Sequence, residues 1–321
     1  MAHERTLQDP WLPDVKRQYV GQDFTDYAAH RRKDGSDRDS VLSLAGQLGV
    51  DIRETLLEAE GSATRALLIG DPAPDPSAAI VYFHGGGHMF GDAYSQAHEL
   101  VTWSAELGVQ VLSVDYRLSP EHPFPAAFND GRTALSWLRK YARHLNIAVE
   151  HIFIYGVSAG GGLAAALAIE AIEQEIPLAG LILASPMLDH RTSCKQHRDE
   201  EGSASYTWNH ENNRQGWSAY LGGAGVVHPP KQASPGSAET LPLLPPSYID
   251  VGGSDLFLNE NLAFAQKAME SGSEVDLRVW GRGYHGFEVL APESGAARTS
   301  RAARRGWLKL ALSRRCMSLP Q

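Results

Sequence analysis

The hydrophobic pattern from about residue 53 onward alternates between short apolar runs and longer amphipathic stretches. The apolar runs suit strands that are buried on both faces, as in a parallel sheet covered by helices. Two runs, 53–61 and 63–71, predict a hairpin. The alternation as a whole predicts one open, doubly wound α/β sheet. The other apolar runs lie at 78–85, 109–117, 151–158, 178–186, 246–253 and 275–281, and the helix-like stretches occupy 95–107, 127–142, 161–175 and 259–272.

Two stretches depart from this alternation. Residues 1–50 contain helical patterns broken by a charged segment, and residues 187–245 are irregular, then helix-like, then rich in Pro, Ser and Gly. The second stretch could be a surface element or a linker. It leaves directly after the apolar run at 178–186, however, so it emerges at the carboxyl edge of the sheet, where ligands bind in this architecture. A lid over the site is therefore the favoured interpretation.

Charge and composition indicate which kinds of partner the protein does not bind. The chain has 29 Lys and Arg against 38 Asp and Glu, and its net charge of −9 disfavours nucleic acid and anionic membrane surfaces as partners. The basic segment 297–315 has helical spacing and is expected to be a solvated helix face. Two cysteines give neither a disulfide framework nor a metal-ligand pattern, so we expect no metal and no cofactor. A polar start and the lack of a long apolar run predict no membrane insertion and a cytoplasmic location.

The segment GVSAG at 156–160 places a serine between a strand-like run and a helix-like run. Gly156 and Gly160 flank Ser158, as in a sharp strand-to-helix turn that holds a hydroxyl clear of the sheet, where a base can activate it. The helix N-terminus also offers backbone N–H groups where an oxyanion would form. From these five residues alone, a capping serine at a glycine-rich helix start is the alternative. The strand before the serine and the helix after it support a catalytic nucleophile as well, so both interpretations stay open at this point.

Three further features follow the pattern of a serine hydrolase. The glycines at 85–87 come directly after a strand-like run, where they let backbone N–H groups point at a ligand, and no Lys-Ser/Thr follows as in a phosphate loop. Asp255 and His285 each follow a later strand, in the chain order serine, acid, histidine. Asp250 is the competing acid, but it lies within its strand. The order and placement of these features predict a catalytic triad.

The chain resembles the hormone-sensitive-lipase-like esterases, a branch of the α/β-hydrolase fold. The resemblance covers about residues 75–290. The matching segments are HGGG at 84–87, DYRLSPEHPFPAA at 115–127, GVSAGGGLA at 156–164, LPPSYIDVGGSDLFLNEN at 244–261 and YHGF at 284–287.

The resemblance implies an α/β-hydrolase fold, with a mostly parallel doubly wound sheet and a helical cap. It also implies a serine carboxylic-ester hydrolase that acts on small-molecule esters with short- to medium-chain acyl groups. By the same resemblance, Ser158 is the nucleophile, Asp255 the orienting acid and His285 the general base. The oxyanion hole is then formed by Gly86, Gly87 and the amide of Ala159.

The resemblance also divides the chain into a core and a cap. It implies N-terminal cap helices at 1–50, a catalytic core of 51–186 and 246–321, and a cap insertion at 187–245. Residues that follow the motif loops are expected to line the substrate pocket, whereas the cap aromatics Tyr206, Trp208 and Trp217 either line it or only pack the cap. Related esterases often pair, so a homodimer is one option for an oligomeric state that stays open. The expected pocket residues are Met89, Phe90 and Leu188.

Three positions differ from the family pattern. Val157 stands where Asp or Thr is usual, and its side chain is expected to point away from the substrate. His88 replaces a common bulky residue after the glycines, and Asn259 stands where Asp is frequent.

Two alternative functions stay open at this point. The same triad would serve amide deacetylation, lactone hydrolysis or acyl transfer. A non-catalytic small-molecule receptor on this scaffold, as in the plant gibberellin receptors that resemble this family, would usually lack the histidine. All three triad side chains are present here, which favours an enzyme.

Overall fold

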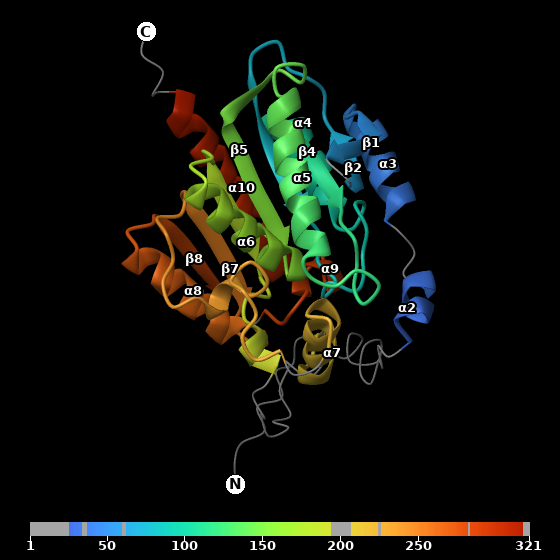
Figure 1. The fold of residues 1–321 in the computed structure, drawn as a ribbon. Helices are drawn as coiled ribbons and strands as arrows, with labels where there is room; N and C mark the ends of the chain where they lie inside the picture. The colour runs from blue at the N-terminus through green and yellow to red at the C-terminus, as the bar shows by residue number, and fades with distance from the viewer. Residues whose placement is uncertain are drawn as a thin grey trace.

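A computed structural model describes residues 26–33, 37–59, 62–193, 207–223, 226–281 and 283–316. Its centre is a sheet of eight strands (Figure 1). The strands are β1 (Ile52–Ala59), β2 (Ser62–Ile69), β3 (Ser77–Phe83), β4 (Gln110–Asp115), β5 (Ile147–Val157), β6 (Gly180–Ala184), β7 (Ser247–Gly252) and β8 (Val275–Trp280).

The strands lie in the order β1-β2-β4-β3-β5-β6-β7-β8. β1 pairs antiparallel with β2, and β2 pairs antiparallel with β4, which confirms the predicted hairpin. All the other pairs are parallel. The predicted mostly parallel, doubly wound sheet is therefore confirmed, and its parallel strands end at one common edge.

The last strand differs from its prediction. The run at 275–281 was expected to be buried on both faces, but β8 is the end strand of the sheet and is only partly covered. Val275 and Leu277 pack against the hydrophobic core, while Asp276 and Arg278, which alternate with them along the strand, are exposed. An end strand has a neighbour on one side only, so its polar positions can face water.

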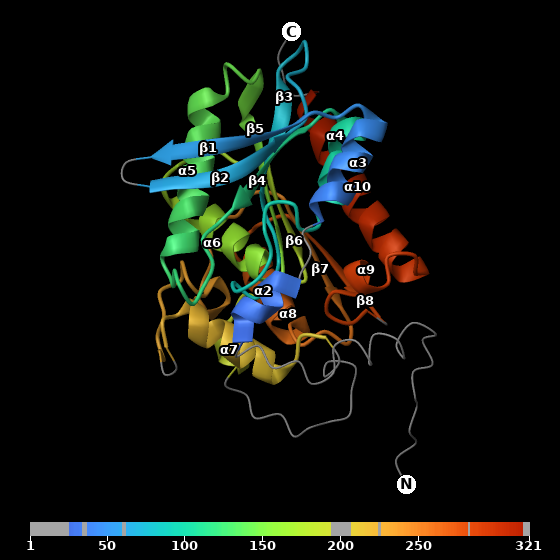
Figure 2. The same cartoon turned by 90° about the vertical axis from the view of Figure 1, so that its right-hand side faces the viewer.

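Helices cover both faces of the sheet (Figure 2). On one face, α5, α6 and α8 enclose one hydrophobic core, and on the other, α3, α4 and α10 enclose a second. The short helices α2 and α7 lie beyond the carboxyl ends of the strands (Figure 1). The helices are α2 (Tyr27–Lys33), α3 (Arg38–Leu48), α4 (Ala97–Leu107), α5 (Ala126–Tyr141), α6 (Ala159–Glu173), α7 (His210–Tyr220), α8 (Leu258–Glu270), α9 (Phe287–Leu290) and α10 (Gly295–Cys316).

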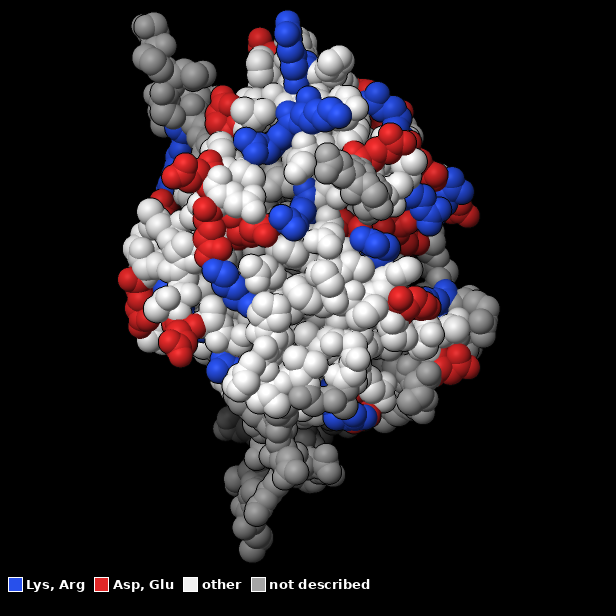
Figure 3. Space-filling model, viewed as in Figure 1, with Lys and Arg blue, Asp and Glu red and all other residues white. Residues whose placement is uncertain are grey.

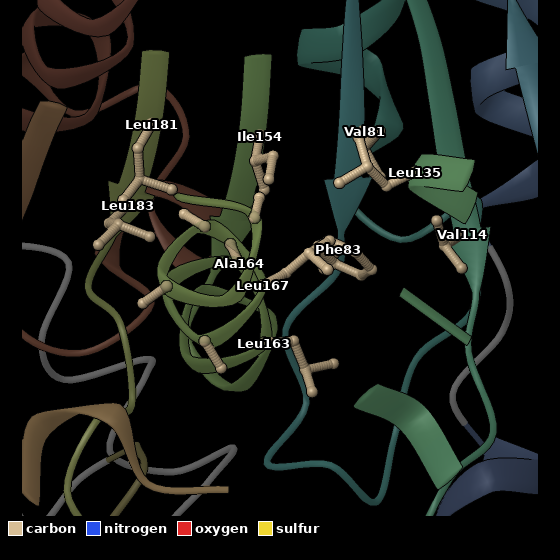
Figure 4. Close-up of a cluster of buried hydrophobic side chains, with 14 of the residues drawn as sticks. Val81, Phe83, Val114, Leu135, Ile154, Leu163, Ala164, Leu167, Leu181 and Leu183 are labelled. Atoms are coloured by element: carbon tan, nitrogen blue, oxygen red, sulfur yellow. The ribbon is translucent and has the colours of Figure 1, made fainter. Parts of the chain in front are cut away.

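Helix α6 is the best buried of these helices, and it follows Ser158 directly. Its small side chains, such as Ala164, let the helix approach the sheet closely. Figure 4 shows Leu163 and Leu167 of α6 among side chains from neighbouring strands, including Phe83 and Ile154. Close packing of this kind leaves little freedom of movement, so the first turn of α6 is held in place against the sheet.

The two stretches expected to form the cap are described in part. In the first, α2 lies near the carboxyl edge of the sheet, whereas α3 packs against α4 through Val41 and Ala45 (Figure 2). In the second, α7 and two short 3₁₀ helices, His190–Ser193 and Pro235–Ser237, are described. Residues 1–25 and 194–206 lie outside the described residues, and the cap boundaries stay a prediction.

Charged side chains of both signs are interspersed on the face seen in Figure 3. They are spread over the upper half and along the sides of this view, and the lower middle is largely uncharged among the described residues.

Candidate active site

Ser158 lies at a strained turn between β5 and α6. Its backbone has φ 52° and ψ −118°, a left-handed conformation that is rare outside glycine. The chain passes so close to itself here that a Cβ on Gly156 would lie 2.1 Å from the Gly160 carbonyl oxygen, and one on Gly160 would lie 2.2 Å from that of Phe83. Both positions therefore require glycine. The Ser158 amide donates to the carbonyl of Ala184, the last residue of β6, at 2.9 Å, and this hydrogen bond holds the turn against the sheet.

The structure brings Ser158, His285 and Asp255 together from three separate loops. The Oγ of Ser158 lies 3.0 Å from Nε2 of His285, and Nδ1 of His285 lies 2.9 Å from Oδ2 of Asp255. The Asp255 side chain is fully buried and that of His285 is 13% exposed. The other carboxylate oxygen of Asp255 accepts the Phe257 amide at 2.9 Å, and the Phe257 ring meets the imidazole edge-on. The three side chains thus form one connected line from a buried acid to a serine hydroxyl.

The glycine turn, residues 85–87, follows β3 and lies next to Ser158 of the triad, since a Cβ on Gly85 would be 3.3 Å from the Ser158 Cβ. Gly86 has φ 119° and Gly87 has φ 60°, both outside the usual range for other residues. The Gly86 carbonyl accepts the amides of Met89 and Phe90, whereas the amides of Gly86 and Gly87 donate to no acceptor within the described residues. Ala159 is the first residue of α6, where a helix amide lacks an intrahelical partner. These three amides are the ones that the sequence predicts for an oxyanion hole.

His84 and His88 flank the glycines and are both buried. His84 stacks on Tyr116, which donates to the His84 carbonyl, and burial lowers the pKa of His84 to about 4. His88 also has a left-handed backbone and stacks on Tyr220 of α7 with ring centres 3.7 Å apart. Neither ring nitrogen of His88 has a hydrogen-bond partner among the described residues, and burial lowers its pKa to about 3. His88 is therefore a neutral aromatic contact between the glycine turn and α7.

The residues predicted to line the substrate pocket are all buried. Met89 is 4% exposed and Phe90 is 7% exposed, and both belong to the tight turn that closes on the Gly86 carbonyl. Leu188 is fully enclosed in the core on the α5 and α6 face. Their contact with a substrate stays a prediction.

Glu260 holds the start of the predicted cap insertion, a role that the sequence does not reveal. Its buried carboxylate accepts the Leu188 amide at 2.6 Å, the Asp189 amide at 3.3 Å and the Thr192 hydroxyl. Burial raises the pKa of Glu260 to about 8. The next residue, Asn261, donates to the Pro186 carbonyl. Helix α8, which begins three residues after Asp255, therefore anchors both the acid loop and the insertion.

Two arginines also hold the site and were not predicted. Arg31 of α2 donates to the carbonyls of Met89 and Ser119, each at 2.7 Å, so α2 is fastened to the loop after the glycines. Arg304 of α10, which the sequence predicts on a solvated helix face, is 1% exposed and pairs with Glu288, three residues after His285. The expectation of a solvated face is wrong at this position, because buried Asp250 and the partly buried Glu99 and Glu288 surround the guanidinium.

The described residues contain no group of three or more His, Cys, Asp or Glu side chains placed to hold a metal ion.

Comparison with known proteins places the chain in a family. A family model of the alpha/beta hydrolase fold matches residues 80–289. The esterase LipI of Mycobacterium tuberculosis is 30% identical over 250 residues, which cover 70% of this chain and 71% of LipI. The chain belongs to the hormone-sensitive-lipase-like esterase family of the alpha/beta hydrolase fold. This confirms both the resemblance and the fold class expected from the sequence.

Two other relatives show the range of this esterase family. The rice gibberellin receptor GID1 is 30% identical over 261 residues, covering 76% of this chain and 73% of the receptor. The crystal structure of esterase LipW from Mycobacterium marinum superposes with a TM-score of 0.85 at 28% identity, covering 94% of this chain and 95% of LipW. Similar identity to an esterase and to a receptor means that identity alone does not separate the two functions, so the geometry of the site must do so.

Proposed function

We propose that this esterase hydrolyses carboxylic esters through an acyl-enzyme on Ser158. The observation that carries the proposal is the unbroken hydrogen-bonded line from Asp255 through His285 to Ser158. A receptor does not need a histidine within hydrogen-bond distance of this serine, whereas a serine hydrolase does.

The geometry supports a two-step mechanism. His285 takes the Ser158 proton at Nε2 as Oγ attacks the ester carbonyl carbon, and Asp255 stabilises the imidazolium through Nδ1–H. The amides of Gly86, Gly87 and Ala159 stabilise the oxyanion, each donor contributing about 3 kcal/mol in such sites. His285 then gives its proton to the leaving alcohol. Water, deprotonated by the same imidazole, attacks the acyl-enzyme and releases the acid.

Covalent labelling of Ser158 tests this proposal. The wild-type enzyme should hydrolyse p-nitrophenyl acetate with a burst equal to the active-site concentration, and a fluorophosphonate should label it once per chain. Ser158→Ala should lose the burst and the label, with turnover reduced by about 10⁶-fold. Ser43→Ala, which changes an exposed serine on α3, is the matched control and should behave like the wild type. Undiminished hydrolysis by Ser158→Ala would refute the proposal.

The choice of reaction is tested in the same assay. An ester, an anilide and a lactone of the same short acyl group compare hydrolysis of the three bonds on one active-site titre. We expect the ester to react fastest, because an alkoxide is a better leaving group than an amide nitrogen and His285 is the proton donor for both. A preference for short to medium acyl chains belongs to the same proposal.

No described helix combines the length and apolar character needed to cross a lipid bilayer. A cytoplasmic location and a homodimer, both expected from the sequence and the family, stay proposals. Sedimentation of the purified enzyme tests the second.

A further inference from the structure

The direction of the Gly87 amide is set by what binds the Gly86 carbonyl. The peptide bond between the two glycines is trans, so its carbonyl and its N–H point in opposite directions. The Gly86 carbonyl accepts the amides of Met89 and Phe90 at 3.0 and 2.9 Å. The direction of the Gly87 amide therefore depends on where those two amides are held.

The peptide groups that carry the Met89 and Phe90 amides are held from outside the glycine turn. The carbonyl of the first, at His88, accepts the Ser119 amide at 2.9 Å. The carbonyl of the second, at Met89, accepts an N–H from Nε of Arg31 at 2.7 Å. Nη2 of the same guanidinium donates to the Ser119 carbonyl, also at 2.7 Å. One side chain of α2 therefore binds both the segment after the turn and the loop that supports it.

The guanidinium of Arg31 is itself held on two further sides. Nη1 donates to Glu121 at 2.8 Å, and the guanidinium carbon lies 5.0 Å from the centre of the Tyr27 ring, one helical turn earlier. The Arg31 side chain is 26% exposed and that of Glu121 is 44% exposed. An arginine keeps its charge at physiological pH and presents its N–H groups in a rigid fork. The two carbonyls are therefore bound by a fixed and permanently positive group.

The charge of Arg31 also reaches the turn through hydrogen-bonded peptide groups. A charged donor makes a stronger hydrogen bond than a neutral one, and it polarises the peptide group between Met89 and Phe90. The Phe90 amide then becomes a stronger donor to the Gly86 carbonyl, and this bond polarises the peptide group that ends in the Gly87 amide. An oxyanion that develops at that amide gains more from the added polarity than a neutral ester carbonyl does, so the effect favours the transition state.

The Gly86 amide does not depend on α2 in this way. The carbonyl of the same peptide group, at Gly85, accepts the Nδ1–H of His84 at 2.8 Å within the loop itself. On another side, the turn is bounded by Trp208, because a Cβ on Gly87 would lie 2.0 Å from Cη2 of the indole. A ring contact of this kind limits the space but gives an amide no direction. The Gly87 amide is therefore the donor that α2 can orient.

We propose that Arg31 is a positioning residue for the oxyanion hole, which acts through the carbonyls of Met89 and Ser119 on the direction and polarity of the Gly87 amide. This inference rests on the acyl-enzyme mechanism proposed above, and it links the rate of that reaction to helix α2.

Two variants of Arg31 measure the effect on p-nitrophenyl acetate hydrolysis. Arg31→Met removes all three hydrogen bonds and keeps an unbranched side chain, whereas Arg31→Lys keeps the charge without the fork. Removing a whole oxyanion-hole donor costs about 10²–10³ in kcat, so misorienting one should cost about 30-fold in Arg31→Met and about fivefold in Arg31→Lys. KM should stay within about twofold of the wild-type value, because the lost interaction is made in the transition state.

A transition-state analogue gives a readout that a merely structural role would not move. A trifluoromethyl ketone adds Ser158 to form a hemiketal whose oxyanion occupies the oxyanion hole. Its Ki should rise in Arg31→Met by the same factor by which kcat/KM falls, about 30-fold, while the Ki of the corresponding alcohol should not change. Rates are taken per site, counted by complete fluorophosphonate labelling, so that loss of folded protein does not contribute.

Two further variants are the controls. Glu121→Gln weakens the exposed ion pair of Arg31 but leaves both carbonyl contacts, and it should change kcat by less than about twofold. Arg132→Met removes a half-exposed arginine of α5 that pairs with Glu170, and it should behave like the wild type.

The outcomes separate this inference from the proposed function. If the wild type neither labels with a fluorophosphonate nor hydrolyses any ester, the proposed function fails, and the inference fails with it. If the wild type is active and Arg31→Met keeps its kcat per labelled site, changes KM alone, or weakens binding of the ketone and the alcohol alike, the function stands and the inference is wrong. A fall in kcat that is smaller in Arg31→Lys, with a matching rise in the Ki of the ketone alone, supports the inference.

Discussion

This esterase has two polar networks near β7 and α9, and they differ in the number of carboxylates that surround the basic group. Asp255 lies just past the end of β7, and His285 lies just before α9; together they serve Ser158. Asp250 lies within β7, and Glu288 lies within α9; together with Glu99 they surround Arg304. The first network has one carboxylate for one imidazole at the rim of the sheet. The second has three carboxylates for one guanidinium in the interior.

The difference shows how catalysis and stability place different demands on buried charge. The imidazole of His285 can gain and lose a proton during a reaction, and its 13% exposed side chain keeps one edge open to the substrate. Arg304 keeps its charge at any physiological pH, so its network can only hold elements together. Burial raises the pKa of Asp250 to about 6, and Arg304 opposes that shift. We therefore expect substitutions in the first network to change rate and substitutions in the second to change stability.

The largest effect is expected from Asp255→Asn. The Asn carbonyl oxygen can still accept the Phe257 amide, which turns the NH₂ group toward Nδ1 of His285. The imidazole must then carry its proton on Nε2, where it can no longer accept the Ser158 proton. We expect kcat to fall about 10⁴-fold. Steady-state rates against p-nitrophenyl acetate, normalised to protein concentration, measure this.

The same variant should stay folded, which distinguishes a tautomer effect from loss of structure. Its denaturation midpoint is expected to stay close to that of the wild type, because the side-chain volume is unchanged and both neighbours keep a hydrogen bond. A variant that loses its rate only in proportion to its folded fraction would contradict the proposed role of Asp255.

Arg304→Met should have the next largest effect, now on stability. Removing the guanidinium leaves Glu99, Asp250 and Glu288 close together without their common partner. Breaking a buried ion pair from one side typically costs about 3–5 kcal/mol. Because the remaining carboxylates would bind protons more tightly in the folded than in the unfolded chain, the loss should grow as the pH rises. Urea unfolding at pH 5.5 and pH 8 measures the free energy of unfolding.

The neighbouring residue provides the control. Arg305→Met removes a half-exposed arginine that pairs with exposed Glu106, a type of pair worth at most about 1 kcal/mol. A similar loss of stability in both variants would show that the buried network is no stronger than a surface pair, and the contrast drawn above would be wrong.

The first network could be predicted from the sequence, and the reason is local geometry. A Cβ on Gly156 or Gly160 would lie within 2.3 Å of nearby backbone atoms, so both positions require glycine. The strained turn at Ser158 can therefore be recognised from five residues of sequence. Asp255 and His285 each follow an apolar run, so the shared edge of a parallel sheet brings them together whatever the details of the loops.

No sequence pattern of this kind predicts the Arg304 network. Arg304 lies in a basic, helical stretch, and only the tertiary position of α10 shows which arginine turns inward. Trp208 is similar, because its contact with Gly87 depends on how α7 sits against the glycine turn. Interactions between elements far apart in the chain are chosen by packing rather than by local pattern, so a single sequence does not identify them.

His88 belongs to neither network, because its ring is titratable and buried but neither ring nitrogen has a hydrogen-bond partner among the described residues. Burial lowers its pKa from 6.5 to about 3, so between these pH values the unfolded chain binds a proton that the folded chain does not. The free energy of unfolding must therefore fall as the pH decreases through this window. From pH 7 to pH 5 the loss from one such histidine is about 2 kcal/mol. His84, whose pKa is lowered to about 4, adds a similar loss.

His88→Asn isolates this contribution. Asparagine tolerates the left-handed backbone at this position better than most residues, although it gives up the stack on Tyr220. The variant should be less stable than the wild type at pH 7, yet lose about 2 kcal/mol less on going to pH 5. His144→Asn, an exposed histidine removed in the same way, should leave the pH slope of the wild type unchanged. Parallel stability curves for the wild type and His88→Asn would mean that the folded chain accepts a proton at His88. A protonated His88 would then place a positive charge on the glycine turn, beside the proposed oxyanion hole.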